Sequence, residues 1–255
     1  MDDNRGQNNS FHFYSWGIVA ANKKRKSDTI EVTPIQDLPF TEGEITSGYK
    51  KINSNGIDSS GGEFQSEVKV TNTISATWIP LGQSNRFTSP DVRRGERVAI
   101  YRFSDQDKYY WITSAKENKI RRLETVIYAV GATKQEGVEL NANNCYFLEI
   151  SGHDKHVTLR TSMANGEIAQ YTIQLNPGKG LATIRDSIGN EFNINSARNK
   201  VECNHSSGDF ISLEGGMTIY KSGVHHFIGN IVCTGSIYAT GVIIDAQGNT
   251  NHHGH

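Results

Sequence analysis

The feature that most constrains this chain is a short repeat near its C-terminal end. Glycine recurs there every six residues, and isoleucine follows each glycine two positions later: Gly229, Gly235 and Gly241, with Ile231, Ile237 and Ile243. A fixed short period is typical of β-structure that turns at glycine and buries the apolar residue. One chain offers only a narrow apolar stripe, and copies of the chain around a symmetry axis are the simplest way to cover it. The repeat therefore predicts an assembly.

The segment before the repeat, residues 145–222, carries short apolar stretches separated by turns rich in Gly, Asn and Pro. Each stretch has only two or three apolar positions, too few for both faces of a sandwich, whereas three copies wound together close one core. We therefore expect an intertwined trimeric β-meander or β-prism over 145–222 and a trimeric β-helix shaft over 223–245. If the three repeat isoleucines of every chain face the axis, they contribute roughly 14–27 kcal/mol as an upper bound.

The N-terminal half has the alternation of a small β-barrel. Residues 1–10 are polar and are expected to be disordered. Residues 11–131 are predicted to form a closed or nearly closed barrel of the OB type, followed by a linker over 132–144. The strands are expected at 11–21 and 29–35, from residue 67 to residue 79, in a hairpin of 97–103 with 109–113, and last at 123–130, with a long loop over 41–62.

Two polar or aromatic features of the barrel allow a second interpretation. The cations at 23–26 suit an exposed turn or a phosphate contact. Tyr109, Tyr110 and Trp111 near Arg121-Arg122 either stack on single-stranded nucleic acid or fill the barrel and cover a subunit contact. A formal net charge of −1 lacks the basic excess that attracts phosphates. We therefore favour the turn and the packing roles, and expect no nucleic-acid partner.

The sequence shows no clear motif for disulfide or metal-binding cysteines, for membrane insertion or secretion, or for catalysis. The three cysteines, Cys145, Cys203 and Cys233, show no CxxC spacing and are expected to be buried thiols. No apolar run reaches the roughly 18 residues of a membrane helix, and residues 1–10 have no signal-peptide pattern, so synthesis in a cytoplasm is expected. Carboxylates are scattered after Glu191, and no Gly-x-Ser-x-Gly arrangement occurs. We expect no enzyme and no small-molecule substrate; the alternatives are a virion-associated β-helical polysaccharide depolymerase and a nucleic-acid-binding OB-fold protein.

Two stretches resemble a known protein family. Residues 88–111 (TSPDVRRGERVAIYRFSDQDKYYW), followed by 121–128 (RRLETVIY), are similar to the barrel domain of a group of baseplate spike proteins, and 248–255 resembles their His-x-His tip. The order of parts resembles the central, membrane-piercing spike of contractile-tailed bacteriophages, which is related in architecture to the spikes of type VI secretion systems. The six-residue spacing departs from the longer repeat of some relatives, and no lysozyme domain is inserted.

The resemblance implies an all-β protein in which an OB-type barrel precedes an intertwined trimeric β-prism and β-helix spike. It implies a homotrimer made in the host bacterial cytoplasm and located in the virion, at the baseplate of the tail. The partners it implies are other baseplate and tail hub proteins, and the outer membrane of a Gram-negative host, which the tip pierces during contraction.

A metal is expected at the tip, residues 246–255. Residues two apart in an extended segment project to the same side, so His253 and His255 point together. Three chains supply six imidazole nitrogens around the axis, which suits octahedral iron(II), nickel(II) or cobalt(II) better than tetrahedral zinc. The family implies iron, so we expect one Fe ion per trimer at the axis, while another octahedral divalent metal remains open.

Overall fold

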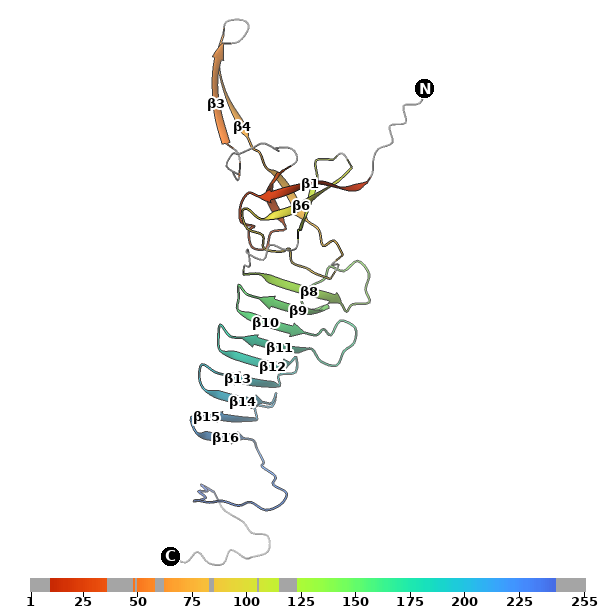
Figure 1. Cartoon of the computed structure of the whole chain (residues 1–255). Coiled ribbons are helices and arrows are strands. Elements are labelled where there is room, and N and C mark those ends of the chain that lie inside the picture. Colours follow the sequence, from red (N-terminus) through yellow and green to blue (C-terminus); the bar gives the residue numbers. More distant parts are fainter. Residues whose placement is uncertain are drawn as a thin grey trace, which may run out of the picture.

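The protein is built from β-strands arranged along one axis (Figure 1). The computed structural model describes residues 10–35, 48, 50–57, 62–82, 85–104, 106–114 and 123–241. They form an N-terminal closed barrel, a two-stranded hairpin and a nine-stranded antiparallel sheet. A helix with the length and apolar character needed to cross a bilayer does not occur among these residues. The expected all-β fold, a barrel followed by an antiparallel meander, is confirmed.

The barrel closes through five strands in the order β1-β2-β5-β7-β6. Their bounds are β1 (Phe11–Val19), β2 (Thr29–Pro34), β5 (Ile74–Trp78), β6 (Arg97–Phe103) and β7 (Tyr109–Thr113). Strands β5 and β7 run parallel, and the other neighbours are antiparallel. Gly17 leaves no room for a side chain against the barrel core, because a Cβ there would lie 2.4 Å from Val32 Cγ2 and 2.5 Å from Ile100 Cδ1.

The aromatic run in β7 divides between the two sides of the barrel wall. Trp111 is completely buried, and its indole Nε1 donates a hydrogen bond of 2.9 Å to the carbonyl oxygen of Asp28. Tyr109 packs against the same core. Tyr110 alternates to the outer side, where its ring contacts Phe11. The interpretation that alternate aromatics fill the barrel is therefore confirmed for Trp111 and Tyr109, and these three residues do not form one stacking platform.

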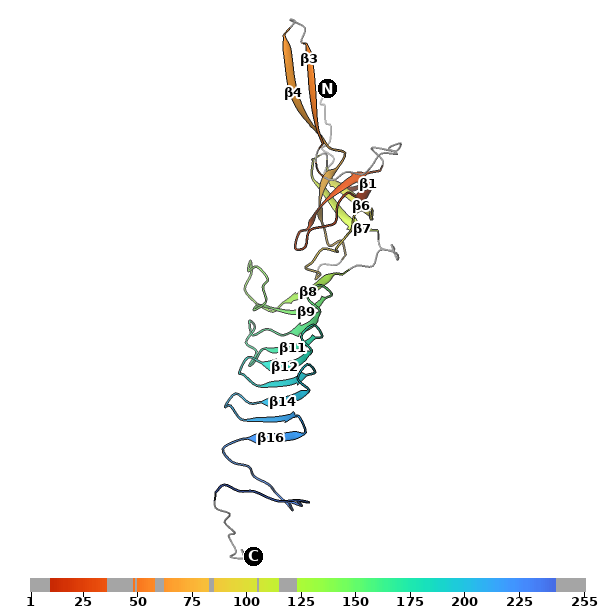
Figure 2. The same ribbon diagram turned by 90° about the vertical axis from the view of Figure 1, so that its left-hand side faces the viewer.

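A hairpin projects from the barrel, away from the sheet (Figures 1 and 2). It consists of β3 (Lys50–Ile57) and β4 (Glu63–Val70), which pair along their whole length. The prediction of an unstructured loop over 41–62 is wrong for residues 50–57. This strand escaped notice because it lacks the alternation of apolar residues that marks a half-buried strand.

The nine-stranded sheet is a simple meander in which each strand pairs with the next one in sequence. The strands are β8 (Thr125–Gly131), β9 (Cys145–Ser151), β10 (His156–Arg160), β11 (Tyr171–Asn176), β12 (Leu181–Asp186), β13 (Glu191–Asn195), β14 (Lys200–Asn204), β15 (Phe210–Glu214) and β16 (Met217–Lys221). The turns from β11 onward are short, whereas longer connections over 132–144 and 161–170 join β8 to β9 and β10 to β11. Gly215 and Gly216 connect β15 to β16 with φ angles of 57° and 82°, as a two-residue turn with positive φ at both positions requires.

The boundary between barrel and sheet differs from the prediction. The segment 123–130 was expected to be the last barrel strand, and 132–144 a linker. In the structure β8 pairs with β9 from Thr125–Ser151 to Gly131–Cys145, so 132–144 joins two neighbouring strands of one sheet. The physical reason is that five earlier strands already close the barrel, which leaves β8 free to begin the sheet.

The strands of the sheet lie across the long axis of the molecule, so successive strands step away from the barrel (Figures 1 and 2). After β16 the chain continues in the same direction, and residues 222–241 contain no strand. The barrel and the C-terminal segment therefore lie at opposite ends of the sheet.

Candidate functional site

The register of the sheet collects its apolar side chains on one face, which we call the apolar face. Directly opposed residues of antiparallel strands share a face. One row along the sheet consists of Val126, Ile150, Val157, Leu175, Ala182, Ile194, Val201 and Leu213. The second row consists of Tyr128, Leu148, Leu159, Ile173, Ile184, Phe192, Cys203, Ile211 and Tyr220.

The apolar face is the less covered side of the sheet. Most of its large side chains in the middle strands are exposed, by between 37% for Val157 and 53% for Leu175, whereas Val201 is partly buried. On the other face, Thr158 and Ser212 are buried. A one-sided antiparallel sheet normally packs its apolar face on a core and turns its polar face to water. The described residues leave the apolar face of this sheet open, so the sheet departs from that arrangement.

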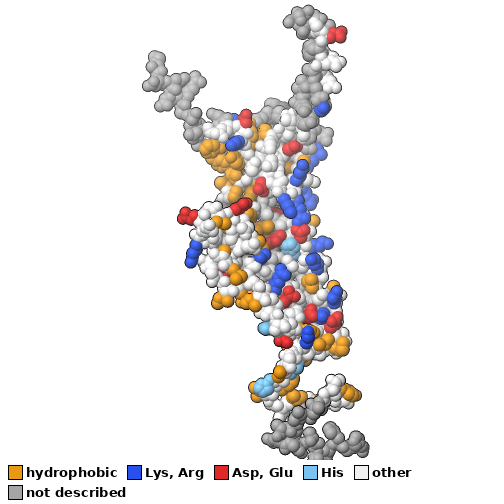
Figure 3. All heavy atoms as spheres, turned by 180° about the vertical axis from the view of Figure 1, so that it is seen from behind, with side chains coloured by type: hydrophobic (Ala, Val, Ile, Leu, Met, Phe, Trp, Pro, Cys, Tyr) orange, Lys and Arg blue, Asp and Glu red, His pale blue; other side chains and the backbone are white. Residues whose placement is uncertain are grey.

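On the opposite face, the polar face, many side chains pair with one another. Gln174 Nε2 donates to Thr158 Oγ1 at 3.1 Å, and Thr183 Oγ1 donates to Asn193 Oδ1 at 2.7 Å. Lys200 Nζ lies 2.5 Å from a carboxylate oxygen of Glu202, and this hydrogen bond raises the pKa of Lys200. Charged side chains are spread over the sheet in the view from behind (Figure 3). This face is chemically suited to water.

The repeat that follows the sheet is partly described. Ile231 and Ile237 are 66% and 71% exposed, and Gly229 and Gly235 adopt positive φ angles of 117° and 151°. Residues 223–241 form no strand and make no backbone-to-backbone hydrogen bond with other described residues. Backbone N–H and C=O groups are paired in native structures. Within the described part of the chain this segment therefore has neither side-chain cover nor backbone partners, and the shaft remains a prediction.

Ile243 of the predicted shaft and the tip residues His253 and His255 lie outside the described part of the chain. The axial position of Ile243, the metal site and its iron therefore stay predictions. Among the residues that the structure does describe, no group of three or more His, Cys, Asp or Glu side chains is arranged to hold a metal.

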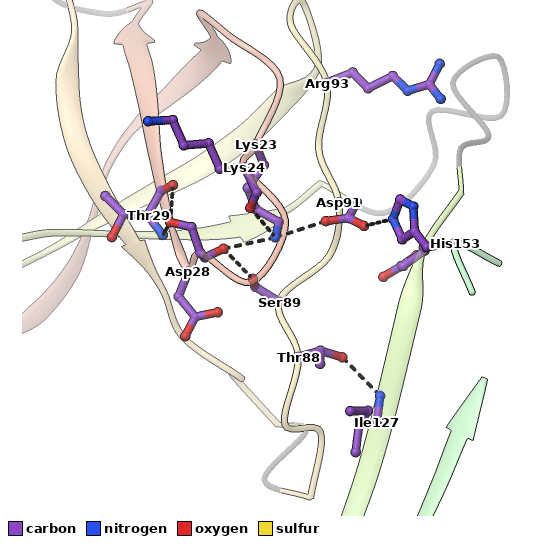
Figure 4. A network of polar contacts seen from close by, with 12 residues as sticks. Lys23, Lys24, Asp28, Thr29, Thr88, Ser89, Asp91, Arg93, Ile127 and His153 are labelled. Atoms are coloured by element: carbon purple, nitrogen blue, oxygen red, sulfur yellow. Dashed lines mark hydrogen bonds and ion pairs between the residues drawn. The ribbon is translucent and has the colours of Figure 1, made fainter. Parts of the chain in front are cut away.

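The barrel is joined to the sheet by backbone pairing. Residues 85–88 run along the outer edge of β8, where Phe87 N donates to Ile127 O at 2.7 Å and Ala129 N donates to Asn85 O at 2.9 Å. Ile127 N donates to Thr88 Oγ1 at 3.0 Å (Figure 4). This segment therefore closes the edge of the sheet that would otherwise be open next to the barrel.

Ion pairs reinforce this junction (Figure 4). Lys23, which is nearly inaccessible, places its Nζ 2.9 Å from Asp91 Oδ1, and His153 Nε2 lies 2.7 Å from Asp91 Oδ2. Burial alone would raise the pKa of Asp91, but hydrogen bonds and charge from His153 and Lys23 outweigh it and hold this pKa below its usual range. Arg25 pairs with Asp154 across the same junction.

A cavity of about 560 Å³ lies beside these pairs. Several of the charged groups that line it already have partners, as Lys23 with Asp91 and Arg25 with Asp154 show. These paired charges connect the barrel to the sheet and are better explained by a structural role than by ligand binding. The cation run at 23–26 lies in the predicted turn, yet the side chain of Lys23 is nearly inaccessible. Its partner Asp91, and His153, which pairs with Asp91, are distant in sequence, and no local pattern predicts these contacts.

The cysteines differ from the prediction of three buried thiols. Cys145 is buried, and its burial raises the pKa of the thiol, whereas Cys203 and Cys233 are exposed in the single chain. The reason is their position. Cys203 belongs to the uncovered apolar face and Cys233 to the segment after β16.

Comparison of the sequence with models of protein families and with curated proteins finds no match to either.

Proposed function

We propose that this chain is a structural protein that works as a homotrimer, with the apolar faces of three sheets turned toward a common axis. The observation that carries the proposal is the apolar face, two continuous rows of half-exposed side chains running the length of the sheet. Large exposed apolar surfaces mark interaction sites. A prism of three sheets covers these rows and leaves the polar faces in water.

The form of the surface favours copies of the same chain as the partner. The rows are only two side chains wide, about 7 Å between positions i and i+2 of a strand. Three narrow faces of equal length close a triangular core, and closed rotational symmetry leaves none of them uncovered. Residues 223–241 lead to the same conclusion independently, because their backbone has no described hydrogen-bond partner in its own chain. Neighbouring copies supply strands to both regions at once.

The biological role that fits this architecture is the central spike of a contractile phage tail. Support comes from the order of parts along one axis (Figure 1), and from the resemblance of residues 88–111 and of the His253 and His255 motif to such spikes. In this role the barrel joins baseplate and tail hub proteins, and the C-terminal tip, stiffened by an iron ion, pierces the outer membrane of the host. The chain acts mechanically, and an enzyme elsewhere in the tail opens the cell wall.

The mass of the purified full-length chain tests the assembly. Light scattering coupled to gel filtration is expected to report three chains. A thiol reagent provides a second measurement, because Cys203 is exposed in a single chain but closed off inside the prism; the Cys203→Ser variant identifies its signal. A monomer with a freely reactive Cys203 would remove the basis of the proposal.

For the biological role, an antibody against the chain is expected to label the tips of contractile tails, and labelling elsewhere on the particle would contradict it.

A further inference from the structure

The outer wall of the barrel carries a second uncovered surface, which we call the aromatic patch. It consists of Phe11, Phe13, Trp16, Tyr101, Phe103 and Tyr110. Register places these residues together: Phe11 is opposite Phe103, and Tyr101 is opposite both Phe13 and Tyr110. An irregularity between Phe13 and Ser15 shifts the alternation of β1. Trp16 is thereby brought to the outer side, while Ser15 is buried.

The rings of the patch are organised against one another. Phe11 stacks on Tyr101 with centroids 5.1 Å apart and planes inclined by 6°. Phe13 meets Trp16 edge-on at 5.5 Å. Trp16 nevertheless remains 42% exposed. An ordered aromatic surface left open to water is characteristic of a protein–protein contact, where aromatic residues are enriched.

The patch is poorly suited to single-stranded nucleic acid. Such sites combine open ring faces with cations that follow the phosphates. Here Phe11 and Tyr101 cover one face of each other. Of the two arginines of β6, Arg102 points to the inside: its guanidinium lies 5.7 Å from the centroid of the Tyr109 ring, and its Nε donates to Gln106 O at 2.9 Å. Arg97 is exposed at the other end of β6, opposite Ile18, so a single arginine of this strand lies at the edge of the patch. The chemistry therefore favours a protein surface as the partner.

The aromatic patch lies on the same side of the molecule as the apolar face. From behind, the sheet displays its charged side chains (Figure 3), so the apolar face is turned toward the viewer of Figure 1. In that view β1 and β6 cross the front of the barrel, and Figure 2 confirms that β1, β6 and β7 lie together on one side. The pairing of residues 85–88 with β8 and the ion pair of Lys23 with Asp91 hold the barrel in this orientation.

We infer that the aromatic patch packs against the barrels of the other two copies, so that the subunit contact extends from the sheet into the barrel. The inference rests on the trimer of the proposed function. An axis that passes in front of the three apolar faces also passes in front of the three patches. Each patch then meets uncharged, aromatic surface of the same kind, and water is excluded from all three at once.

Tryptophan fluorescence tests the contact in the unmodified full-length protein. The chain has three tryptophans, of which Trp111 is buried and Trp78 is half-buried, whereas Trp16 belongs to the patch. The difference in iodide quenching between the wild type and Trp16→Phe reports the accessibility of Trp16. A trimer in which Trp16 is protected supports the inference. A trimer in which Trp16 is readily quenched would overturn it and leave the proposed function intact, with the patch open to a different protein. A monomer would overturn both.

A charge introduced into the patch gives a matched pair of variants. In Phe13→Asp we expect a trimer held by the sheets, with a lower melting temperature and a several-fold increase in quenching of Trp16. The control is Phe87→Asp, which replaces a similarly exposed phenylalanine at the junction, outside the patch; quenching of Trp16 should stay at the wild-type level. Equal quenching in both variants would contradict the inference. So would tight binding of a fluorescein-labelled oligothymidine to the wild type that Phe13→Asp abolishes, because the patch would then be a stacking site.

Discussion

An aspartate in the middle of the apolar face tests whether this face lies at the centre of an assembly. Ile173 is 40% exposed in the single chain, so closing a trimer over it covers surface worth roughly 0.6–1.2 kcal/mol per chain, or about 2–4 kcal/mol for three. Ile173→Asp removes this contribution. It also takes three carboxylates out of water at several kcal/mol each, about 10 kcal/mol or more together. We expect the variant to be monomeric by light scattering at concentrations where the wild type is trimeric.

The adjacent residue on the other face supplies the control. Thr172 is paired in register with Arg160 on one side and Arg185 on the other, so the carboxylate of Thr172→Asp would lie between two cations on the polar face. This variant is expected to remain trimeric. Burial raises the pKa of a carboxyl, so acidification should partly restore the Ile173→Asp trimer. The reasoning is refuted if Ile173→Asp keeps the mass and melting temperature of the wild type, or if both variants dissociate alike.

Three further predictions concern the shaft, the tip and the junction. Ile237→Asp is expected to abolish the resistance of the assembly to heat and detergent, since three carboxylates would meet near the axis; gel mobility of unheated samples measures this, and unchanged resistance would place Ile237 elsewhere. Elemental analysis of protein without an affinity tag is expected to find about one iron per three chains, lost in the double variant His253→Ala, His255→Ala and on acidification through the histidine range near pH 6; a metal-free wild type would exclude the site. The lowered pKa of Asp91 means that its ionised form stabilises the fold above about pH 4 and that this contribution disappears as pH falls through the folded-state pKa. Thermal unfolding of Asp91→Asn should therefore depend less steeply on acid than that of the wild type, and identical slopes would show that Asp91 contributes nothing to the junction.

Much of the fold could be predicted because it rests on local patterns. Alternation in 97–103 and 109–113 marked the hairpin of β6 and β7, and Gly215-Gly216 marked the turn before β16. Pairing between strands that are distant in sequence has no local pattern and could not be predicted. Segment 123–130 is recognisable as a strand, yet nothing within it indicates whether its partner is the barrel or Cys145–Ser151. The strand over residues 50–57 is stabilised by its backbone pairing with β4. Amino-acid composition alone does not predict such pairing.

The candidate site was predictable in kind, while its arrangement depends on register. Each meander strand shows its two apolar positions in the sequence, but their alignment into two rows follows from the lengths of all the turns together, since a slip of one residue sends a strand's side chains to the opposite face. The junction was not predictable at all. Lys23 is buried only because Asp91 and His153 come to it from two other segments, and the aromatic patch needs the irregularity in β1 to include Trp16.

The crosswise orientation of the strands makes the sheet respond differently to pushing and to pulling. Its strands are stacked along the long axis (Figure 1), about 4.8 Å apart, so the ladders of hydrogen bonds run parallel to that axis. A pull on the two ends loads these ladders a strand at a time, and the strands can peel away in sequence from β16. A push brings neighbouring backbones into van der Waals contact along the entire stack, where repulsion rises steeply. The stack of strands therefore resists compression along its axis better than it resists tension.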